Sequence, residues 1–531
     1  MQTFIKNNKL LIFIFLLSLI GGFLRFYNLN WGSPFYFHPD ERNIASSVTQ
    51  LNFPNQMNLH FFAYGSFPIY IIYFTGLIIN LFLKSQDLFV QSIFISRFYS
   101  TILSLLLIPS IYLIGKKLYN KKVGLLSAVL STFSVGLIQF AHFGTFEIWL
   151  TFLGLWLFYF SLKLTKDLNF KNIIIAGIIF GLLVSTKISS LPLIVLPVLS
   201  MLIAYVSGKK SALSIFKTTI KGLSLILISI AVFAFCSPYV FLDLKSFASS
   251  MQYESSVAFG TLPVFYTGEF FNSIPILFQF TKIYPFLINP ILTIIFIPSF
   301  FYVCFKWIET KDPKYLILNT FYLILFLPQA FLFAKWTRYI VPTMPFTYLI
   351  IAIFLERFIN KKILNIIVLI CIIFAAFYLI TAFVKKDTRI EASIWAKENI
   401  PGNSTILSEV YDMGIVPFNQ YFSKITLFNF YDLDQIPNVK ESELSNVLLE
   451  TEYVIIPSQR ILKTRMINKN KFPSGHKFYN ELVNENLVFE KIYETPCDIF
   501  CKIIYLGDPV FSFEQTANAF DRPSVFIFKK I

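Results

Sequence analysis

Charged side chains are scarce in this sequence. Asp, Glu, Lys and Arg together make up 14% of the 531 residues, whereas hydrophobic residues make up 56% and the mean hydropathy is +0.65. An ordinary water-soluble domain carries about 25% charged residues, so this composition excludes a chain built around one soluble core. Long apolar runs with so little charge are typical of a polytopic membrane protein.

Acidic residues are fewer than basic residues, but only in one part of the chain. Residues 1–383 hold 28 Lys and Arg against 11 Asp and Glu, whereas residues 384–531 hold 17 against 19. The formal net charge of +15 therefore belongs to the hydrophobic part, where loop lysines set the orientation in the membrane, and it does not indicate a nucleic-acid partner. We divide the chain into a membrane domain, residues 1–383, and a soluble domain, residues 384–531.

Cysteine is also rare, and its placement does not suggest a metal centre. The five cysteines form no metal-ligand pattern. Cys236, Cys304 and Cys371 lie in apolar segments, where cysteine behaves as a small hydrophobic residue. Cys497 and Cys501 are the two that could pair, but we expect their spacing to be coincidental.

The lysines predict how the membrane domain is oriented. Lys6 and Lys9 precede an apolar run that is long enough to span and is not followed by a small-residue cleavage site, so we expect an uncleaved first helix with a cytoplasmic N-terminus. The lysine-rich loops 115–124, 163–171, 208–221, 306–314 and 356–362 should then all be cytoplasmic. About eleven spans satisfy this rule: 10–27, 97–115, 123–140, 146–163, 172–187, 189–206, 222–240, 285–306, 315–333, 339–356 and 362–383.

One apolar run does not fit a simple count. Counting residues 67–83 as a crossing would place the lysine-rich loop 115–124 outside. We therefore interpret residues 28–96 as one long outer loop, whose apolar part lies in the interface or re-enters the membrane. The soluble domain then also lies outside.

The soluble domain has the pattern of a small α/β fold. A helical stretch at 389–400 is followed by a Pro-Gly turn and by strand-like runs at 404–410, 453–458 and 501–506. The domain contains no recognisable catalytic spacing.

Polar residues collect on the outer side of this topology. The stretch FHPDERN, residues 37–43, follows the first span and contains His38, Asp40, Glu41 and Arg42. Other polar residues on the same side are His60, Tyr64, His142, Glu147, Lys187, Glu254, Lys335, Arg338 and Tyr339. Ionisable groups at membrane depth are functional by default, so this face is the candidate site.

Simpler roles exist for several of these residues. The acidic pair follows Pro39 and suits the first turn of a helix and its dipole. Glu147 can begin a helix in the same way, Lys187 can snorkel to the interface, and Lys335 and Arg338 can anchor the chain in an aromatic belt. The histidines lie on separate segments without ligand spacing, so we expect no metal site. The sequence does not say whether a divalent cation is needed.

The order of these features resembles a known superfamily. An acidic pair in the first outer loop, a second acid in the next one (His142 to Glu147), a membrane lysine in GLLVSTK, a SPYVFLD segment and a late KWTRYIVPTMP motif resemble the polyprenyl-phosphate-sugar-dependent glycosyltransferases of the C superfamily. Within it, the chain is most similar to the bacterial branch related to protein O-mannosyltransferases and to aminoarabinose transferases of lipid A. The resemblance covers roughly the whole membrane domain. It implies a helical bundle with juxtamembrane helices in a long first outer loop.

The resemblance also implies roles for the candidate residues. Asp40 and Glu41 are the catalytic candidates, with Asp40 as the base. His38, Arg42, His60, Tyr64, His142 and Glu147 would orient the acceptor or the sugar, and Lys187, Lys335, Arg338 and Tyr339 would bind the donor phosphate. Glu147 stands where an aspartate is common among relatives.

These roles imply a reaction mechanism, and one alternative function competes with it. A single displacement with one carboxylate as base inverts the anomeric centre, whereas Glu41, adjacent on a helix, would diverge from Asp40 and could not act as a second nucleophile. We therefore expect inverting transfer of a sugar from a polyprenyl phosphate to an extracytoplasmic acceptor, a protein hydroxyl, glycan or lipid. The rival is a transporter or flippase of a lipid-linked substrate, although the sequence lacks the two related halves that such proteins often show.

Overall fold

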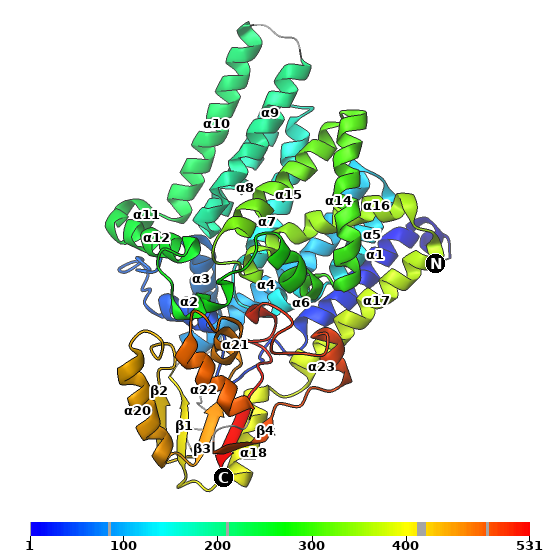
Figure 1. The fold of residues 1–531 in the computed structure, drawn as a ribbon. Coiled ribbons are helices and arrows are strands. Elements are labelled where there is room, and N and C mark those ends of the chain that lie inside the picture. The colour runs from blue at the N-terminus through cyan, green and yellow to red at the C-terminus, as the bar shows by residue number, and fades with distance from the viewer. Residues whose placement is uncertain (1, 83–86, 209–211, 411–420, 485–487) are drawn as a thin grey trace.

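The structure is a helical bundle that carries a small mixed domain at one end (Figure 1). This computed structural model describes residues 2–82, 87–208, 212–410, 421–484 and 488–531. The helices up to the long outer loops are α1 (Gln2–Phe26), α2 (Pro39–Thr49), α3 (Ser66–Phe82), α4 (Leu88–Leu118), α5 (Lys121–Thr132), α6 (Val135–His142), α7 (Glu147–Leu164), α8 (Phe170–Thr186), α9 (Val195–Ser207), α10 (Ala212–Cys236), α11 (Tyr239–Leu242) and α12 (Leu244–Phe259). The remaining helices of the bundle are α13 (Tyr284–Leu287), α14 (Pro290–Thr310), α15 (Pro313–Phe331), α16 (Met344–Phe358) and α17 (Lys361–Leu379).

Within the described residues, eight helical segments have the length and hydropathy to cross a membrane: 88–118, 147–164, 188–207, 213–236, 290–310, 313–331, 337–358 and 361–384. The pair α5 and α6, bent by 53° at its break, adds a ninth. The predicted number of about eleven is reached if α8, which has 17 residues, and the apolar part of α1 also span. The chain is thus an integral, multi-pass membrane protein.

The predicted outer loop 28–96 is partly helical. It contains α2 and α3, and α3 packs against α4 and α8 rather than standing apart. The span predicted at 97–115 begins earlier than expected, because the Asp87 carboxylate accepts the Phe89 N–H at 3.0 Å and starts α4 nine residues before the predicted boundary. The prediction of juxtamembrane helices in this loop agrees with α2 and α3.

The soluble domain contains a five-stranded sheet. Its strands are β1 (Thr405–Glu409), β2 (Lys424–Phe428), β3 (Tyr453–Ile456), β4 (Phe489–Glu494) and β5 (Phe526–Lys530), in the order β2-β1-β3-β5-β4. The strand β1 is parallel to β2 and β3, whereas β5 is antiparallel to β3 and β4. Its helices are α18 (Thr388–Asn399), α20 (Pro437–Glu450), α21 (Arg460–Ile467), α22 (Pro473–Val483) and α23 (Ile499–Ile504).

Both faces of this sheet are covered, because successive strand residues are buried on opposite sides. Leu407 and Val454 lie in one core cluster with residues of α21 and α22, whereas Ile406 and Ile455 lie in another with residues of α18. The predicted helix and the first two predicted strands therefore correspond to α18, β1 and β3.

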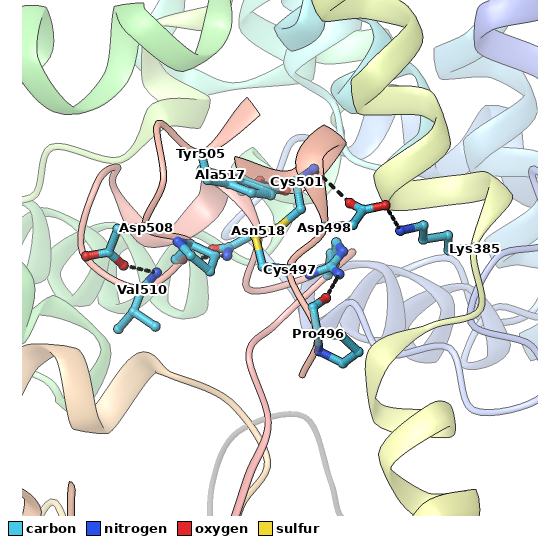
Figure 2. The surroundings of a disulfide bond; sticks show 12 residues. Lys385, Pro496, Cys497, Asp498, Cys501, Tyr505, Asp508, Val510, Ala517 and Asn518 are labelled. Carbon is cyan, nitrogen blue, oxygen red and sulfur yellow. Dashed lines mark hydrogen bonds and ion pairs between the residues drawn. A yellow bond between two sulfur atoms is a disulfide. The ribbon is translucent and has the colours of Figure 1, made fainter. Parts of the chain in front are cut away.

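The third predicted strand, 501–506, is wrong, because this stretch forms α23 and a turn. Asp498 caps α23 by accepting the Cys501 N–H at 3.1 Å. Cys497 and Cys501 form a disulfide, so the expectation that their spacing is coincidental is wrong. Figure 2 shows Asp498 beside this bond, between the Cys501 N–H and the ammonium of Lys385. The helix α23 packs against α17, so this corner joins the soluble domain to the bundle.

A second connection is made by residues 511–522, which we call the docking segment. The Lys282 ammonium donates to the Phe511 carbonyl at 2.8 Å, and the Gln139 amide donates to the Thr516 carbonyl at 3.0 Å. Glu514 is fully buried and accepts the Thr337 N–H at 3.0 Å. The docking segment therefore lies against the bundle next to residue 338.

Candidate active site

The site is centred on an ion pair between residues far apart in the sequence. Asp40 lies in the first turn of α2, whose N-terminus begins at Pro39 as the simpler interpretation also predicted. Arg338 lies in a short turn before α16, and its Nη1 donates to Asp40 Oδ2 at 2.6 Å. The Tyr64 hydroxyl lies near this carboxylate. Burial alone would raise the pKa of Asp40, but the Arg338 guanidinium and the Tyr64 hydroxyl lower it below its ordinary value.

Asp40 and Arg338 line a cavity of about 510 Å³ between the bundle and the soluble domain. It also contains three other residues that the sequence predicted, Tyr64, Lys187 and Tyr339. The remaining walls come from the outer loops and the soluble domain: Pro39, Asn43, Phe61, Ala63, Tyr253, Glu254, Val257, Phe265, Tyr266, Trp336, Arg460, Gln515, Thr516 and Phe520. The cavity is large enough for a sugar-sized ligand, and it presents one carboxylate ion-paired to a guanidinium.

A smaller crevice of about 70 Å³ lies on the membrane side of the same residues. Lys187, Arg338 and Tyr339 line both spaces. The other walls of the crevice are largely apolar, from α7, α8, residues 189–193, α15 and residue 342: Leu150, Gly154, Leu183, Ser189, Ser190, Pro192, Leu193, Ile324, Leu325, Pro328, Gln329 and Pro342. Glu147, the first residue of α7, is buried in its wall, and its Oε2 has no hydrogen-bond partner in the described part of the chain.

Aromatic rings hold the two cations at this junction. The Lys187 ammonium lies 5.5 Å from the Tyr64 ring centroid and 5.1 Å from that of Tyr339. The Arg338 guanidinium lies 4.7 Å from the ring centroid of Trp336. Cation–π contacts stabilise a positive charge without neutralising it, so both cations can still attract an anion.

Glu41 does not face the cavity. Its carboxylate receives the Arg97 guanidinium in two bonds, Nε to Oε1 at 2.9 Å and Nη2 to Oε2 at 2.6 Å, and also accepts the Gly144 N–H at 2.6 Å. Both charged side chains are fully buried. Neighbouring residues on a helix point in different directions, so Asp40 turns toward the cavity while Glu41 fastens α2 to α4. Glu41, a predicted catalytic residue, therefore does not line the cavity with Asp40 in this structure.

The three predicted histidines also lie away from the cavity lining. His38 is buried against the rings of Phe143 and Phe520, with centroids 4.7 and 4.3 Å away. His142 lies between backbone carbonyls, 2.8 Å from one and 2.9 Å from the other. His60 is exposed, with its Nδ1 3.7 Å from the carboxylate of Asp243.

Two predicted cations are also separated from Asp40. Arg42 is exposed on α2 and does not line the cavity. Lys335 is buried, and its ammonium donates to the Phe333 carbonyl at 3.3 Å rather than turning toward the cavity. The structure therefore brings Lys187, not Lys335, together with Arg338.

Sequence reasoning gave no role to several residues that line the cavity. Glu254 on α12 was recognised only as an outer acid; burial raises its pKa. The soluble domain contributes Arg460, whose Nε donates to the side-chain oxygen of Gln515 at 3.0 Å, and the Gln515 amide donates in turn to the Tyr266 carbonyl at 3.1 Å. No motif marks Arg460 or Gln515, because their place in the site depends on how the two domains dock.

Among the described residues, no group of three or more His, Cys, Asp or Glu side chains converges as a metal site would require.

Comparisons with known proteins show which family and which solved structures this chain resembles. Residues 68–238, which include Glu147 and Lys187 but neither Asp40 nor Arg338, match the family described as dolichyl-phosphate-mannose-protein mannosyltransferase. No curated protein sequence is significantly similar to the chain.

Two solved structures resemble the fold along nearly its whole length. One is the Archaeoglobus fulgidus oligosaccharyltransferase tethered to an acceptor peptide with the NVT sequon, with a TM-score of 0.51 and 14% identity, covering 99% of this chain and 89% of that one. The other is ArnT from Cupriavidus metallidurans bound to undecaprenyl phosphate, with a TM-score of 0.51 and 10% identity, covering 98% of each chain. The resemblance predicted from the sequence is thereby confirmed: the chain has the fold of the polyprenyl-phosphate-sugar-dependent glycosyltransferases of the C superfamily.

Proposed function

We propose that this protein is an inverting glycosyltransferase that moves a sugar from a polyprenyl phosphate to an acceptor on the outer side of the membrane. The observation that carries the proposal is the Asp40–Arg338 pair, at a wall shared by a polar cavity and an apolar crevice. A lipid-linked sugar has the same division, with a polar sugar phosphate joined to a hydrocarbon chain. Transporters also hold ionisable groups in their substrate pathways, so bond cleavage is the observation that separates a transferase from a transporter or flippase.

The donor would lie across the junction of the two spaces. Its prenyl chain would enter the apolar crevice from the membrane, and its phosphate would meet Arg338 and Lys187, which line both spaces. Arginine suits this position because its planar fork binds two phosphate oxygens at once. The crystal structure of ArnT with undecaprenyl phosphate supports a lipid phosphate as the ligand of this fold.

The reaction can be written with this chain's own groups. The acceptor hydroxyl or amine gives its proton to the Asp40 carboxylate as its oxygen or nitrogen bonds to the anomeric carbon from the side opposite to the phosphate. The bond from that carbon to the phosphate oxygen breaks, and the departing phosphate gains negative charge that Arg338 and Lys187 stabilise. Because phosphate competes for the guanidinium, donor binding weakens the Asp40–Arg338 pair and raises the pKa of Asp40, which makes it a better base.

The acceptor would enter on the side of the soluble domain. Gln515, Thr516 and Arg460 form that wall of the cavity, and the A. fulgidus structure with a tethered acceptor peptide supports a separate acceptor for a protein of this fold. We place the N-terminus in the cytoplasm and the soluble domain outside, as the lysine-rich loops require. The Cys497–Cys501 disulfide supports this orientation, because disulfides persist in oxidising compartments outside the cytoplasm.

The test is transfer from a panel of labelled polyprenyl-phosphate sugars by the purified protein and its variants. Asp40→Asn should lower the single-turnover rate by about 10²–10⁴-fold, the usual effect of losing a general base. The matched control is Asp243→Asn, the same change at an outer acid that lies outside the cavity, and it should retain the rate. Near-normal transfer by Asp40→Asn would refute the role of this carboxylate, and donor binding by the wild type without any bond cleavage would favour the transporter.

A further inference from the structure

A second large cavity lies at the other end of the bundle from Asp40. The helix α7 runs from Glu147, beside the crevice, to Leu164, and α8 returns from Phe170 to the residue before Lys187. At 1.5 Å per residue, these helices of 18 and 17 residues separate their two ends by about 25 Å. The cavity at the far end has a volume of about 680 Å³, and the proposed transfer reaction makes no use of it.

This second cavity is strongly basic, and we call it the basic cavity. Five lysines from three separate parts of the sequence line it: Lys117 in the last turn of α4, Lys163, Lys166 and Lys171 around the α7–α8 connection, and Lys314 at the start of α15. Only two acids accompany them, so the lining carries three positive charges in excess.

Those two acids already have partners. The carboxylate of Asp167 accepts the backbone N–H of Asn169 at 3.1 Å and its side-chain amide at 2.6 Å. Asp312 accepts the Lys314 N–H at the start of α15 and lies 3.0 Å from the ammonium of the same lysine. The other four lysines of the lining have no carboxylate partner within 4.0 Å in the described part of the chain.

The inner wall of the basic cavity is aromatic and apolar. The Lys163 ammonium lies 4.8 Å from the ring centroids of both Tyr159 and Phe160, and the Lys117 ammonium donates to the Tyr159 hydroxyl at 2.6 Å. Leu162 and Ile175 complete this wall. Lys163 and Lys314 are half-buried and Lys117, Lys166 and Lys171 are exposed. All five lysines line one cavity, and two of them, Lys117 and Lys163, contact its aromatic wall.

We propose that the basic cavity binds the phosphate head group of an anionic phospholipid from the leaflet opposite to the active site. The lysines would donate to the phosphate oxygens, and the apolar wall would contact the glycerol and the first acyl carbons. Basic pockets between transmembrane helices bind anionic head groups in this way, and a zwitterionic lipid would present its own ammonium to the lysines and be disfavoured.

The experiment compares lipids with matched acyl chains. The purified protein in detergent is titrated with phosphatidylglycerol, phosphatidylcholine or inorganic phosphate, and binding is followed by native mass spectrometry and by the shift in melting temperature. The triple variant Lys117→Gln, Lys163→Gln, Lys314→Gln should bind phosphatidylglycerol at least tenfold more weakly than the wild type. Inorganic phosphate and phosphatidylcholine should stabilise neither protein appreciably.

The control is a second triple variant at the same end of the bundle, Lys121→Gln, Lys361→Gln, Lys362→Gln, whose lysines are exposed and lie outside the cavity. Equal loss of phosphatidylglycerol binding in both variants would mean a general positive surface and would overturn the proposal. Equal stabilisation by inorganic phosphate would show a site for a free anion instead of a lipid. If the first triple variant does not fold, Lys163→Gln alone should weaken binding and Lys163→Arg should restore it; an unchanged affinity in Lys163→Gln would refute the site.

Discussion

Asp521 offers a direct test of how the docking segment is held against the bundle. Its carboxylate is buried, and Oδ2 accepts the Tyr378 hydroxyl at 2.5 Å and the Gln139 amide at 3.1 Å. Burial raises the pKa of Asp521 from 3.8 to about 6, because the charged form loses its hydration. We predict that Asp521→Asn removes a pH-dependent loss of stability that the wild type shows.

The magnitude follows from the difference between the two pKa values. A rise of about two pH units at about 1.36 kcal/mol each corresponds to about 3 kcal/mol. Because the pKa is raised in the folded state, this contribution to the free energy of unfolding is fully present below about pH 4 and is lost as the pH rises through about 6. The asparagine variant has no proton to lose, so its free energy of unfolding should exceed that of the wild type by about 3 kcal/mol more at about pH 7 than at about pH 4.

The Asp521→Asn substitution also changes the free energy of unfolding by an amount that does not depend on pH, and this amount does not affect the test. In the wild type, Asp521 Oδ1 has no hydrogen-bond partner in the described part of the chain, so the amide group that replaces it would be buried without an acceptor. That costs about 1–3 kcal/mol at every pH. The slope of the difference against pH, rather than its value at one pH, is therefore the quantity to measure.

Both proteins are unfolded by heating in one detergent, from roughly pH 4 to pH 8. The readout of unfolding is the loss of protection of the soluble domain from protease. Glu441→Gln, at an exposed position on α20, is the matched control and should differ from the wild type by a constant amount. If the difference between Asp521→Asn and the wild type is also constant, or grows toward low pH, the buried carboxylate does not govern docking in the way we derive.

Two further predictions concern the fastening of α2 and the orientation of the chain. Glu41→Gln should lower the yield of folded protein, unlike Asp40→Asn, because it leaves the buried Arg97 charge without a partner at a cost of about 3–5 kcal/mol; normal yield and melting temperature would contradict this. In a background without free cysteines, a cysteine at Ser445 should react from outside the cell with an impermeant thiol reagent and one at Lys122 should not. The opposite labelling pattern would reverse the proposed topology.

Local signals in the sequence were sufficient for much of the bundle. Apolar runs are long and continuous, and most lysines are concentrated in a few short loops, so both can be read without knowing any tertiary contact. The pairing of Arg338 with Asp40 was not predicted as a contact, but both residues were assigned to the same site, because rare ionisable residues on one face of a membrane protein have few alternatives.

The predictions from sequence fail or are incomplete where tertiary contacts determine the local structure. The divergence of Glu41 from Asp40 was predicted from helix geometry, but its partner Arg97 was not. An arginine at the start of a predicted span was the signal that could have revealed this pair. The run 501–506 has the apolar character of a strand, but the Asp498 cap and the disulfide start a helix there. Gln515 and Thr516 carry no signal at all, because their role exists only after the domains meet.

The docking segment has a consequence for biogenesis. Every membrane helix precedes it in the sequence, so the bundle, with its carboxylate and both cations, is synthesised and inserted before Gln515, Thr516 and Phe520 can close the cavity. A nascent chain that has released only α1 to α17 would hold Asp40, Lys187 and Arg338 in a cavity that still lacks the wall supplied by the soluble domain. The cavity can therefore reach its complete form only after the soluble domain has been synthesised and has docked on the bundle.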